Sequence, residues 1–343
     1  MLKPLHDLLE GRNLDDAGVQ IALAQLISAP EAAVSAAILT AWAIKGETGA
    51  ELAAAAAIIM PRAIPLPIEG QFIDTCGTGG DGLGTFNIST ATAIVVAACG
   101  VRVVKHGNRA VSSQSGSADA LTHLGIATDI PVHLLAEGLD RVGVVFCLAT
   151  RHHPALAGLG ALRKQLGFRS LFNALGPLLN PAQTGRQVIG AGQPRWLDSI
   201  AQAAAILDRE KVCVVRGEDG LDEVTLDGDT HLRIVECGTV RSMVLSPSVW
   251  GLGRVETGAL RARSPEESAK RIVNMLQGKD APAEQVVRAN AALALWTAGI
   301  DDDFRSCAER ARQAVSGGSA LAVLENWRTW TREVIGFNKK TES

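Results

Sequence analysis

The apolar positions along this chain follow two patterns, which divide it near residue 68. The first sixty residues contain Ala-, Ile- and Leu-rich runs, two of them preceded by Ser28-Ala-Pro-Glu31 and Thr48-Gly-Ala-Glu51, which match capping boxes at helix N-termini. The segment 60–67 then contains three prolines, which a helix interior does not tolerate. We therefore expect a small α-helical domain over residues 1–67, with a domain junction at its end.

From residue 72 onward, short β-branched runs alternate with helical segments. Such alternation is typical of a mostly parallel sheet with helices on its faces. Residues 225–262 are rich in Thr, Val, Gly and Arg, which indicates an antiparallel excursion, and residues 265–330 return to helices. The sequence thus predicts an α/β fold, with a large α/β domain over 68–335 after the helical domain and a tail over 336–343. The expected strands are 101–104, 142–146, 188–189 and 212–215.

Composition narrows the class of protein. The chain has 343 residues, 47% of them hydrophobic and 20% charged, which is typical of a folded globular protein. It has no run of 18 apolar residues, and its first residues lack the apolar core of a signal peptide. The six cysteines include no C-x-x-C pair, which argues against zinc and disulfides, and the net charge of −3 does not favour nucleic acid. We expect a cytoplasmic protein without a membrane or nucleic-acid partner.

Two stretches rich in glycine and hydroxyl side chains carry the candidate chemistry. Residues 74–90 read Asp-Thr-Cys-Gly-Thr-Gly-Gly-Asp-Gly-Leu-Gly-Thr-Phe-Asn-Ile-Ser-Thr, and residues 105–119 read Lys-His-Gly-Asn-Arg-Ala-Val-Ser-Ser-Gln-Ser-Gly-Ser-Ala-Asp. Glycines let backbone N–H groups turn onto phosphate oxygens, and Lys105 and Arg109 add positive charge. A helix expected to begin at 87–90 would offer free N–H groups and its dipole to an anion. The two stretches predict a polyphosphate site.

Two common phosphate motifs do not account for these stretches. Gly77-x-Gly79-x-x-Gly82 satisfies the dinucleotide fingerprint, but that fingerprint also needs an acid about 20 residues further on to hold a ribose hydroxyl. Here the next expected strand ends in Lys105-His106 instead. A Walker loop is excluded because no Gly-Lys-Ser/Thr follows at the required spacing. The basic residues favour a ligand with phosphates at both ends.

Further motifs occur in order along almost the whole chain. They are Lys45-Gly-Glu-Thr48, His153-Pro-Ala155, Arg163-Lys-Gln-Leu-Gly-Phe-Arg-Ser-Leu-Phe-Asn-Ala-Leu-Gly-Pro-Leu-Leu-Asn-Pro181, Gly217-Glu-Asp-Gly-Leu-Asp-Glu-Val224 and Asn290-Ala-Ala-Leu-Ala-Leu295. Together with the two loops, they resemble the anthranilate phosphoribosyltransferases. The resemblance implies transfer of the phosphoribosyl group of phosphoribosyl pyrophosphate (PRPP) to anthranilate, with Mg²⁺. It also implies a homodimer, and a helical domain that a returning segment near 163–180 joins.

The resemblance assigns roles to residues of both loops and beyond. Lys105 and Arg109 would stabilise the departing pyrophosphate as catalytic residues. PRPP would contact Gly77, Gly80, Asp81, Thr85, Asn87, Ile88, Ser89, Thr90, Lys105, His106, Gly107, Asn108, Arg109, Ala110, Val111, Ser112, Ser113 and Ser117. Anthranilate would contact Gly77, Asn108, His153, Arg163 and Pro177. Mg²⁺ would be held by Ser89, Asp222 and Glu223. Position 114 is Gln where many relatives have Lys.

Alternative interpretations remain at several of these positions. Without the resemblance, Asp222-Glu223 would be a solvated acidic pair, and Arg163 an ordinary helix-face cation like Lys164 and Arg169. A pyrimidine nucleoside phosphorylase shares a Lys-His-…-Arg loop, but it resembles this chain less because it has Ser at the position of Gly107 and no Asp-Glu metal pair. A non-catalytic relative that binds nucleic acid would need a basic face, which the net charge does not favour.

Overall fold

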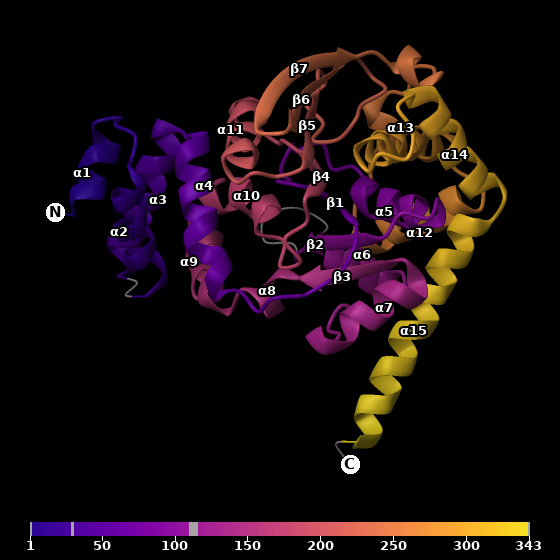
Figure 1. Cartoon of the computed structure of the whole chain (residues 1–343), viewed down its shortest axis with the longest axis horizontal. Helices are drawn as coiled ribbons and strands as arrows, with labels where there is room; N and C mark the ends of the chain where they lie inside the picture. Colours follow the sequence, from indigo (N-terminus) through magenta and orange to yellow (C-terminus); the bar gives the residue numbers. More distant parts are fainter. Residues whose placement is uncertain (1, 29–30, 110–115, 342–343) are drawn as a thin grey trace.

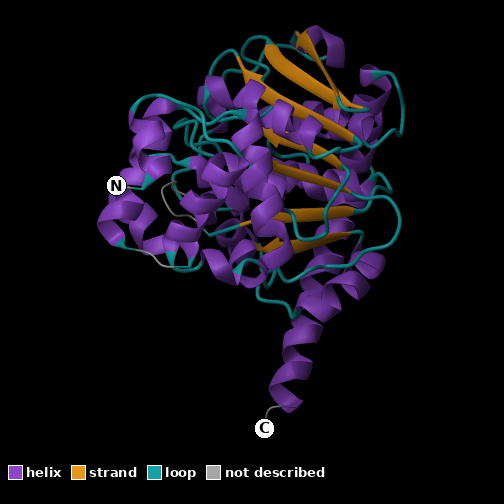
Figure 2. Ribbon diagram, turned by 60° about the vertical axis from the view of Figure 1, so that its left-hand side comes forward, coloured by secondary structure: helices purple, strands orange, loops and turns teal. Residues whose placement is uncertain are grey.

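The computed structural model describes residues 2–28, 31–109 and 116–341. A seven-stranded sheet lies at its centre, in the strand order β3-β2-β1-β4-β5-β6-β7 (Figures 1 and 2). The first five strands in that order are parallel, and β6 and β7 pair in antiparallel fashion at one edge. The strands are β1 (Ile73–Gly77), β2 (Val103–Gly107), β3 (Val144–Leu148), β4 (Arg186–Gly190), β5 (Lys211–Gly217), β6 (Thr230–Glu236) and β7 (Thr239–Leu245). This arrangement confirms the predicted α/β class, and the β6–β7 hairpin is the expected antiparallel excursion.

Helices cover both faces of the sheet, and the side chains of each strand alternate between the two faces. Along β5, Val212 and Val214 pack into one core cluster, whereas Cys213 and Val215 pack into the other. One face carries α5 (Ile88–Ala98), α6 (Ser117–His123), α7 (Leu135–Val142), α12 (Pro265–Leu276), α13 (Ala281–Thr297), α14 (Phe304–Ser316) and α15 (Ser319–Thr341). The other face carries α11 (Pro194–Ile206) and, beyond it, the N-terminal helices (Figure 1).

The N-terminal helices share their core with a later segment of the chain. They are α1 (Lys3–Leu9), α2 (Asp16–Ile27), α3 (Ala32–Lys45) and α4 (Gly49–Ile59). The same apolar cluster contains residues of α9 (Leu159–Leu166) and α10 (Leu171–Leu175), which follow the short helix α8 (Ala149–His152). Because this cluster also includes α11, the helical part is packed firmly onto the sheet. The predicted boundaries at 67/68 and around 163–180 stay predictions.

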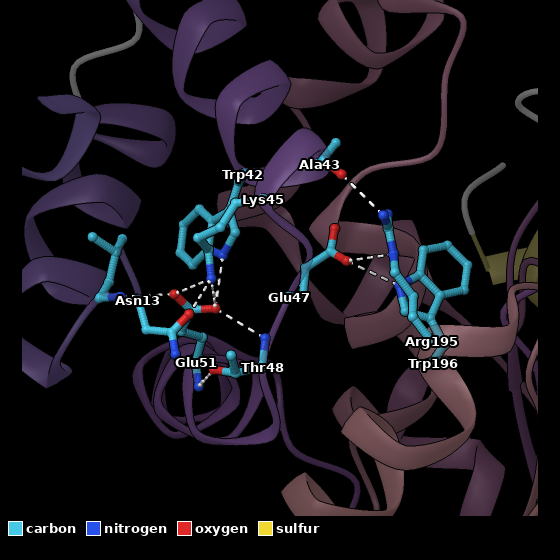
Figure 3. A network of polar contacts seen from close by, with 10 residues as sticks. Asn13, Trp42, Ala43, Lys45, Glu47, Thr48, Glu51, Arg195 and Trp196 are labelled. Carbon is cyan, nitrogen blue, oxygen red and sulfur yellow. Dashed lines mark hydrogen bonds and ion pairs between the residues drawn. The ribbon is translucent and has the colours of Figure 1, made fainter. Parts of the chain in front are cut away.

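The polar contacts around Glu47 and Glu51 hold α4 in place (Figure 3). Thr48 and Glu51 form the expected capping box, and the Glu51 carboxylate also accepts from the ammonium of Lys45 at 2.8 Å. The indole N–H of Trp196 on α11 donates to Glu47 at 3.0 Å. A Cβ at Gly49 would lie 2.4 Å from a side-chain carbon of α11, so the close approach of α4 requires glycine there.

The capping box expected at Ser28 is wrong. Ser28 is the C-cap of α2, and α3 begins at Ala32 with Glu31 as its N-cap. The structure also starts β2 and β3 two residues later than expected, and β4 two residues earlier. Helix α7 ends at Val142, and its C-cap Gly143 has a φ of +84°, which favours glycine, so β3 begins only after it. Strand β2 likewise follows Gly100, whose φ is +87°. Of the helices in the described part of the chain, none is long and apolar enough to cross a membrane.

Candidate active site

The carboxyl ends of β1, β2, β4 and β5 meet at one edge of the sheet and bring the predicted site residues together. The strand order reverses at β1, which pairs with β2 on one side and with β4 on the other. A ligand site in an open α/β sheet is expected at such a reversal. Gly77 at the end of β1 pairs with Gly190 at the end of β4, and the Asp222-Glu223 loop follows β5.

Glycines at the strand ends let these loops approach one another. A Cβ at Gly190 would lie 1.7 Å from the backbone oxygen of Asp222, and a Cβ at Gly77 would lie 2.8 Å from its carboxylate. A Cβ at Gly192 would lie 2.4 Å from the backbone oxygen of Gly79. Gly190 and Gly192 were missed at the sequence level. The available signal was their position, as Gly-Ala-Gly directly after an expected strand.

An acidic cluster lies where the first loop meets the loop after β5. Burial and the nearby charge of Asp81 raise the pKa of Asp222, which is buried and accepts from the backbone N–H of Gly79. Loss of contact with water and the charge of Asp222 raise the pKa of Glu223. Both carboxylates therefore lack a sufficient counter-charge, and a cation bound between them would stabilise their ionised forms.

The amino end of α5 donates a backbone hydrogen bond to Glu223. The backbone N–H of Ser89 donates to the Glu223 carboxylate, and those of Ile88 and Thr90 donate to carbonyls of the preceding turn. The expectation that these three N–H groups are free for a phosphate is therefore wrong. The side chains of Ile88 and Thr90 are buried in the core, so neither can reach a ligand without rearrangement. The helix dipole stabilises a carboxylate of the protein instead.

Lys105 lies inside the sheet, not in a loop as expected, because β2 extends to Gly107. Its side chain is 1% exposed, and its ammonium donates to the backbone oxygen of Thr75 and to the hydroxyl of Ser89, 3.1 Å away. It also attracts Glu223 electrostatically. Lys105, Ser89 and Glu223 therefore form one group, and the charge of Lys105 is already used within the protein.

The oxygen ligands at this site would hold Mg²⁺ only together with oxygen atoms of water or of a substrate. Within the described ranges, no three His, Cys, Asp or Glu side chains are grouped so that they could hold a metal ion alone. Mg²⁺ usually binds to one or two carboxylates and completes its shell with water and substrate phosphates. Asp222 and Glu223, with the Ser89 hydroxyl nearby, offer such an incomplete set of oxygen ligands.

The outer part of the first loop is fixed by the segment before α12. Thr85 forms a β-bridge with Arg261, and the amide oxygen of Asn87 accepts from the hydroxyl of Ser268 at 2.7 Å. Asp81 accepts from the backbone N–H of Leu83 at 3.0 Å. A pocket of about 620 Å³ beside the loop is lined by Gly82, Leu83, Gly84, Gly258, Arg261, Ala262, Arg263 and Glu267.

The second predicted loop is described only at its two ends. Gly107 is needed there because a Cβ would lie 2.3 Å from the hydroxyl of Ser117. The Asn108 side chain accepts from the backbone N–H of Arg109 at 2.8 Å, and the exposed guanidinium of Arg109 lies 3.9 Å from Asp119. The predicted PRPP contacts Ala110, Val111, Ser112 and Ser113, with Gln114, lie outside the described residues.

His106, His153 and Pro177 come together beside the end of β2. The two imidazole rings are 5.5 Å apart, and burial lowers the pKa of both, that of His106 to about 3. His106 contacts the carbonyl of Gly176 and His153 that of Leu179, while Pro177 accepts from Gln187 through its carbonyl. The histidines are therefore neutral, and they pack against backbone carbonyls of the returning segment.

Buried Asp74 connects this segment to the sheet. Asn180 donates to the Asp74 carboxylate at 2.9 Å and to the carbonyl of Val104 at 2.9 Å, and the backbone N–H of His106 donates to Asp74 at 3.2 Å. Burial raises the pKa of Asp74. The network fixes residues 176–180 against the carboxyl ends of β1 and β2.

Two arginines reach the site from the helical side. Arg163 on α9 lies 5.8 Å from the ring centroid of Phe172 and donates weakly to Asn173 at 3.4 Å. Burial and the charge of Arg169 lower the pKa of Arg163. Arg169 lies over Gly80 of the first loop, where a Cβ would be 1.3 Å from its Cζ. The sequence placed Arg169 among ordinary helix-face cations, and no local signal distinguishes it.

The chain is similar to known proteins along most of its length. Residues 69–321 match the family described as "Glycosyl transferase family, a/b domain". The anthranilate phosphoribosyltransferase of Parasynechococcus marenigrum is 44% identical over 85% of this chain and 84% of its own length. The crystal structure of anthranilate phosphoribosyltransferase from Thermus thermophilus matches with a TM-score of 0.86 at 34% identity, over 96% of this chain and 100% of that one. The Saccharomyces cerevisiae enzyme in complex with PRPP and Mg matches with a TM-score of 0.86 at 25% identity, over 96% and 97% of the two chains.

Proposed function

This chain belongs to the anthranilate phosphoribosyltransferase family, and on that premise we propose how its site performs the reaction. The enzyme transfers the phosphoribosyl group of PRPP to the amine of anthranilate, which yields N-(5-phosphoribosyl)anthranilate and pyrophosphate in tryptophan biosynthesis. The observation that carries the assignment of the site is the meeting of the glycine loop, the Asp222-Glu223 pair and the two arginines at one edge of the sheet.

The reaction breaks the bond between C1 of the ribose and a pyrophosphate oxygen, and it forms a bond from C1 to the anthranilate nitrogen. The nitrogen has a free lone pair at neutral pH, so its attack needs no strong base, and it loses a proton afterwards. Positive charge develops on the ribose while negative charge develops on pyrophosphate. The protein therefore contributes mainly by positioning and by electrostatic stabilisation of the leaving group.

The acidic pair is the proposed Mg²⁺ site, with Ser89, Asp222 and Glu223 as ligands. Two desolvated carboxylates would repel a diphosphate unless a cation lay between them. A Mg²⁺ ion bound there neutralises charge on the leaving group. Lys105 donates to the Ser89 hydroxyl and attracts the Glu223 carboxylate. We therefore propose that it acts in catalysis by positioning the metal ligands and not by direct contact with pyrophosphate.

Anthranilate is proposed to bind between the histidines and Arg163. The planar guanidinium of Arg163 matches a carboxylate, and the buried rings of His106 and His153 with Pro177 provide an uncharged wall for an aromatic ring. Gly77 and Asn108 keep their predicted roles as contacts from the strand side. Anthranilate would thus lie on the helical side of the site and the phosphates on the sheet side.

The cellular setting is part of the proposal. We propose a cytoplasmic homodimer, without nucleic-acid or membrane partners. Five of the six cysteines are buried or partly buried, and none of the six forms a disulfide, which fits a reducing compartment. The apolar side chains of Leu9 and Ile44 on the N-terminal helices are 63% and 81% exposed, which is compatible with a subunit contact there.

The direct test of the function mixes the protein with PRPP, Mg²⁺ and anthranilate and follows the loss of anthranilate fluorescence. Consumption should require all three components, and pyrophosphate should accumulate in equal amount. Cleavage of a pyrimidine nucleoside by free phosphate, without use of anthranilate, would instead support the phosphorylase. Salt-resistant binding of a labelled oligonucleotide without either activity would support the nucleic-acid-binding relative.

Replacement of Arg163 by Ala should raise the KM for anthranilate much more than the KM for PRPP. Loss of a charge-assisted fork costs about 1.5–3 kcal/mol, which is about 10- to 100-fold in affinity. Steady-state kinetics with each substrate varied in turn measures the two constants. Lys164→Ala, an exposed cation on the same helix, serves as the control. An unchanged KM for anthranilate with impaired use of PRPP would contradict the assignment.

A further inference from the structure

Arg169 lies directly against the glycine turn of the first loop. Gly79 and Gly80 have φ values of +64° and +83°, and a Cβ at Gly80 would lie 1.3 Å from Cζ of Arg169 and 1.8 Å from its Nε and Nη2. The position of this Cβ is therefore almost at the centre of the guanidinium group, which faces the Cα atom of Gly80. Arg169 thus covers the glycine turn of the loop that we expect to bind phosphate.

The guanidinium of Arg169 has N–H donors that are available to a ligand. Within the described part of the chain, the side chain of Arg169 makes no hydrogen bond and no ion pair within 4.0 Å, although it is about half-buried. Asp81 and Asp222 attract it electrostatically, and Arg163 repels it. The N–H donors of Arg169 are not among the buried polar atoms that lack a partner, so they are open to water and can be offered to a ligand. A planar fork of this kind matches phosphate oxygens.

The other two cations assigned to the leaving group are less available. The ammonium of Lys105 is buried and already donates to Thr75 and Ser89. The guanidinium of Arg109 is largely exposed and lies 3.9 Å from Asp119. Of Lys105, Arg109 and Arg169, only Arg169 has a side chain without a hydrogen-bond or ion-pair partner among the described residues.

The local chain fixes where Arg169 can reach. It lies on the short connection between α9 and α10, after Gly167, which ends α9 at a φ of +67°, and before Ser170, the N-cap of α10. Asn173 accepts from the backbone N–H of Ser170 at 3.2 Å and from Arg163 at 3.4 Å. Asn173 therefore links Arg163 to the backbone next to Arg169, and Arg169 lies on the side of the glycine turn.

We propose that Arg169 binds the pyrophosphate group of PRPP, and of the product, by donating its free N–H groups to the phosphate that occupies the turn at Gly79 and Gly80. The flexible side chain moves off the turn as the phosphate enters and then contacts it from the helical side. The two arginines of the returning segment thus divide the substrates, since Arg163 faces anthranilate and Arg169 the leaving group. This role rests on the proposed function.

The test measures binding of inorganic pyrophosphate with Mg²⁺ to the full-length protein by titration calorimetry. Arg169→Gln should raise the Kd of Mg²⁺–pyrophosphate about 10- to 100-fold, as expected for loss of a charge-assisted fork. Arg169→Lys, which keeps the charge but loses the fork, should give an intermediate value. The control Lys164→Gln removes one exposed positive charge from the same segment and should leave the Kd unchanged.

Wild-type or tighter binding of pyrophosphate by Arg169→Gln would overturn the proposal, because Arg169 would then merely cover the turn. If Arg169→Gln fails to fold, Arg169→Lys decides in the same way. The proposed function is tested separately. A wild-type protein that binds Mg²⁺–pyrophosphate but does not consume anthranilate would refute the function, whereas an active wild type with an indifferent Arg169→Gln would refute only this inference.

Discussion

The double variant Asp222→Asn, Glu223→Gln is expected to lose on the order of 100-fold in kcat and to need more Mg²⁺ for half-maximal activity. The two side chains are the proposed metal ligands, and the amides keep their shape while removing both charges. The backbone N–H groups of Gly79 and Ser89 can still donate to the amide oxygens, so the loop should keep its conformation. Activity titrated against Mg²⁺ at saturating PRPP measures both effects.

The same variant should melt no lower than the wild-type protein in Mg²⁺-free buffer. Desolvation and like-charge repulsion raise the pKa of both acids, so the folded protein is destabilised by holding them ionised. Removing both charges relieves that cost, as is common where a functional site is strained. The control Glu266→Gln, Asp302→Asn changes two exposed acids by the same total charge. A Mg²⁺ curve that superimposes on wild type at unchanged kcat would show that Asp222 and Glu223 do not hold the metal ion.

The sequence predicted the fold class because the relevant signals are local. Alternation of β-branched runs with helical segments, and the proline-rich segment 60–67, do not depend on tertiary contacts. Strand starts were less predictable. Gly100 and Gly143 turn the chain at the carboxyl ends of helices, and a run of valines gives no sign of where that turn lies. The two-residue shift is what places Lys105 inside β2.

The motifs predicted which residues form the site, but not how their charges and hydrogen bonds are paired. The spacing of Ser89 and Glu223, 134 positions apart, gives no sign that the backbone of one donates to the carboxylate of the other. Likewise, Lys105 in a sequence of loop-like residues suggests an exposed cation, whereas its neighbours in space bury it. Arg169 is indistinguishable from Lys164 in sequence, and only the path of the chain after Gly167 brings it onto Gly80.

Gly190→Ala is expected to lower kcat/KM about 100-fold, although residue 190 itself contacts no substrate in our proposal. Its Cβ would lie 1.7 Å from the backbone oxygen of Asp222, so the loop that carries the acidic pair must move. A shift of about 1 Å at a reacting group can cost about 100-fold in rate, and overpacking should cost about 1–3 kcal/mol of stability. Kinetics and thermal melting measure the two effects, with Gly253→Ala as the control because a Cβ there meets nothing within 4 Å.

The mechanism of this effect is testable with a double-mutant cycle. If Gly190→Ala acts by displacing Asp222 and Glu223, it should reduce activity little further in the Asp222→Asn, Glu223→Gln background, because the group it disturbs is already disabled. Full additivity would mean that Gly190 acts elsewhere, for example through its pairing with Gly77 in the sheet. Wild-type kinetics in Gly190→Ala alone would show that the loop carrying Asp222 and Glu223 can move without loss of activity. The position of these carboxylates would then not limit the reaction, since a Cβ at residue 190 cannot be accommodated while the loop stays in place.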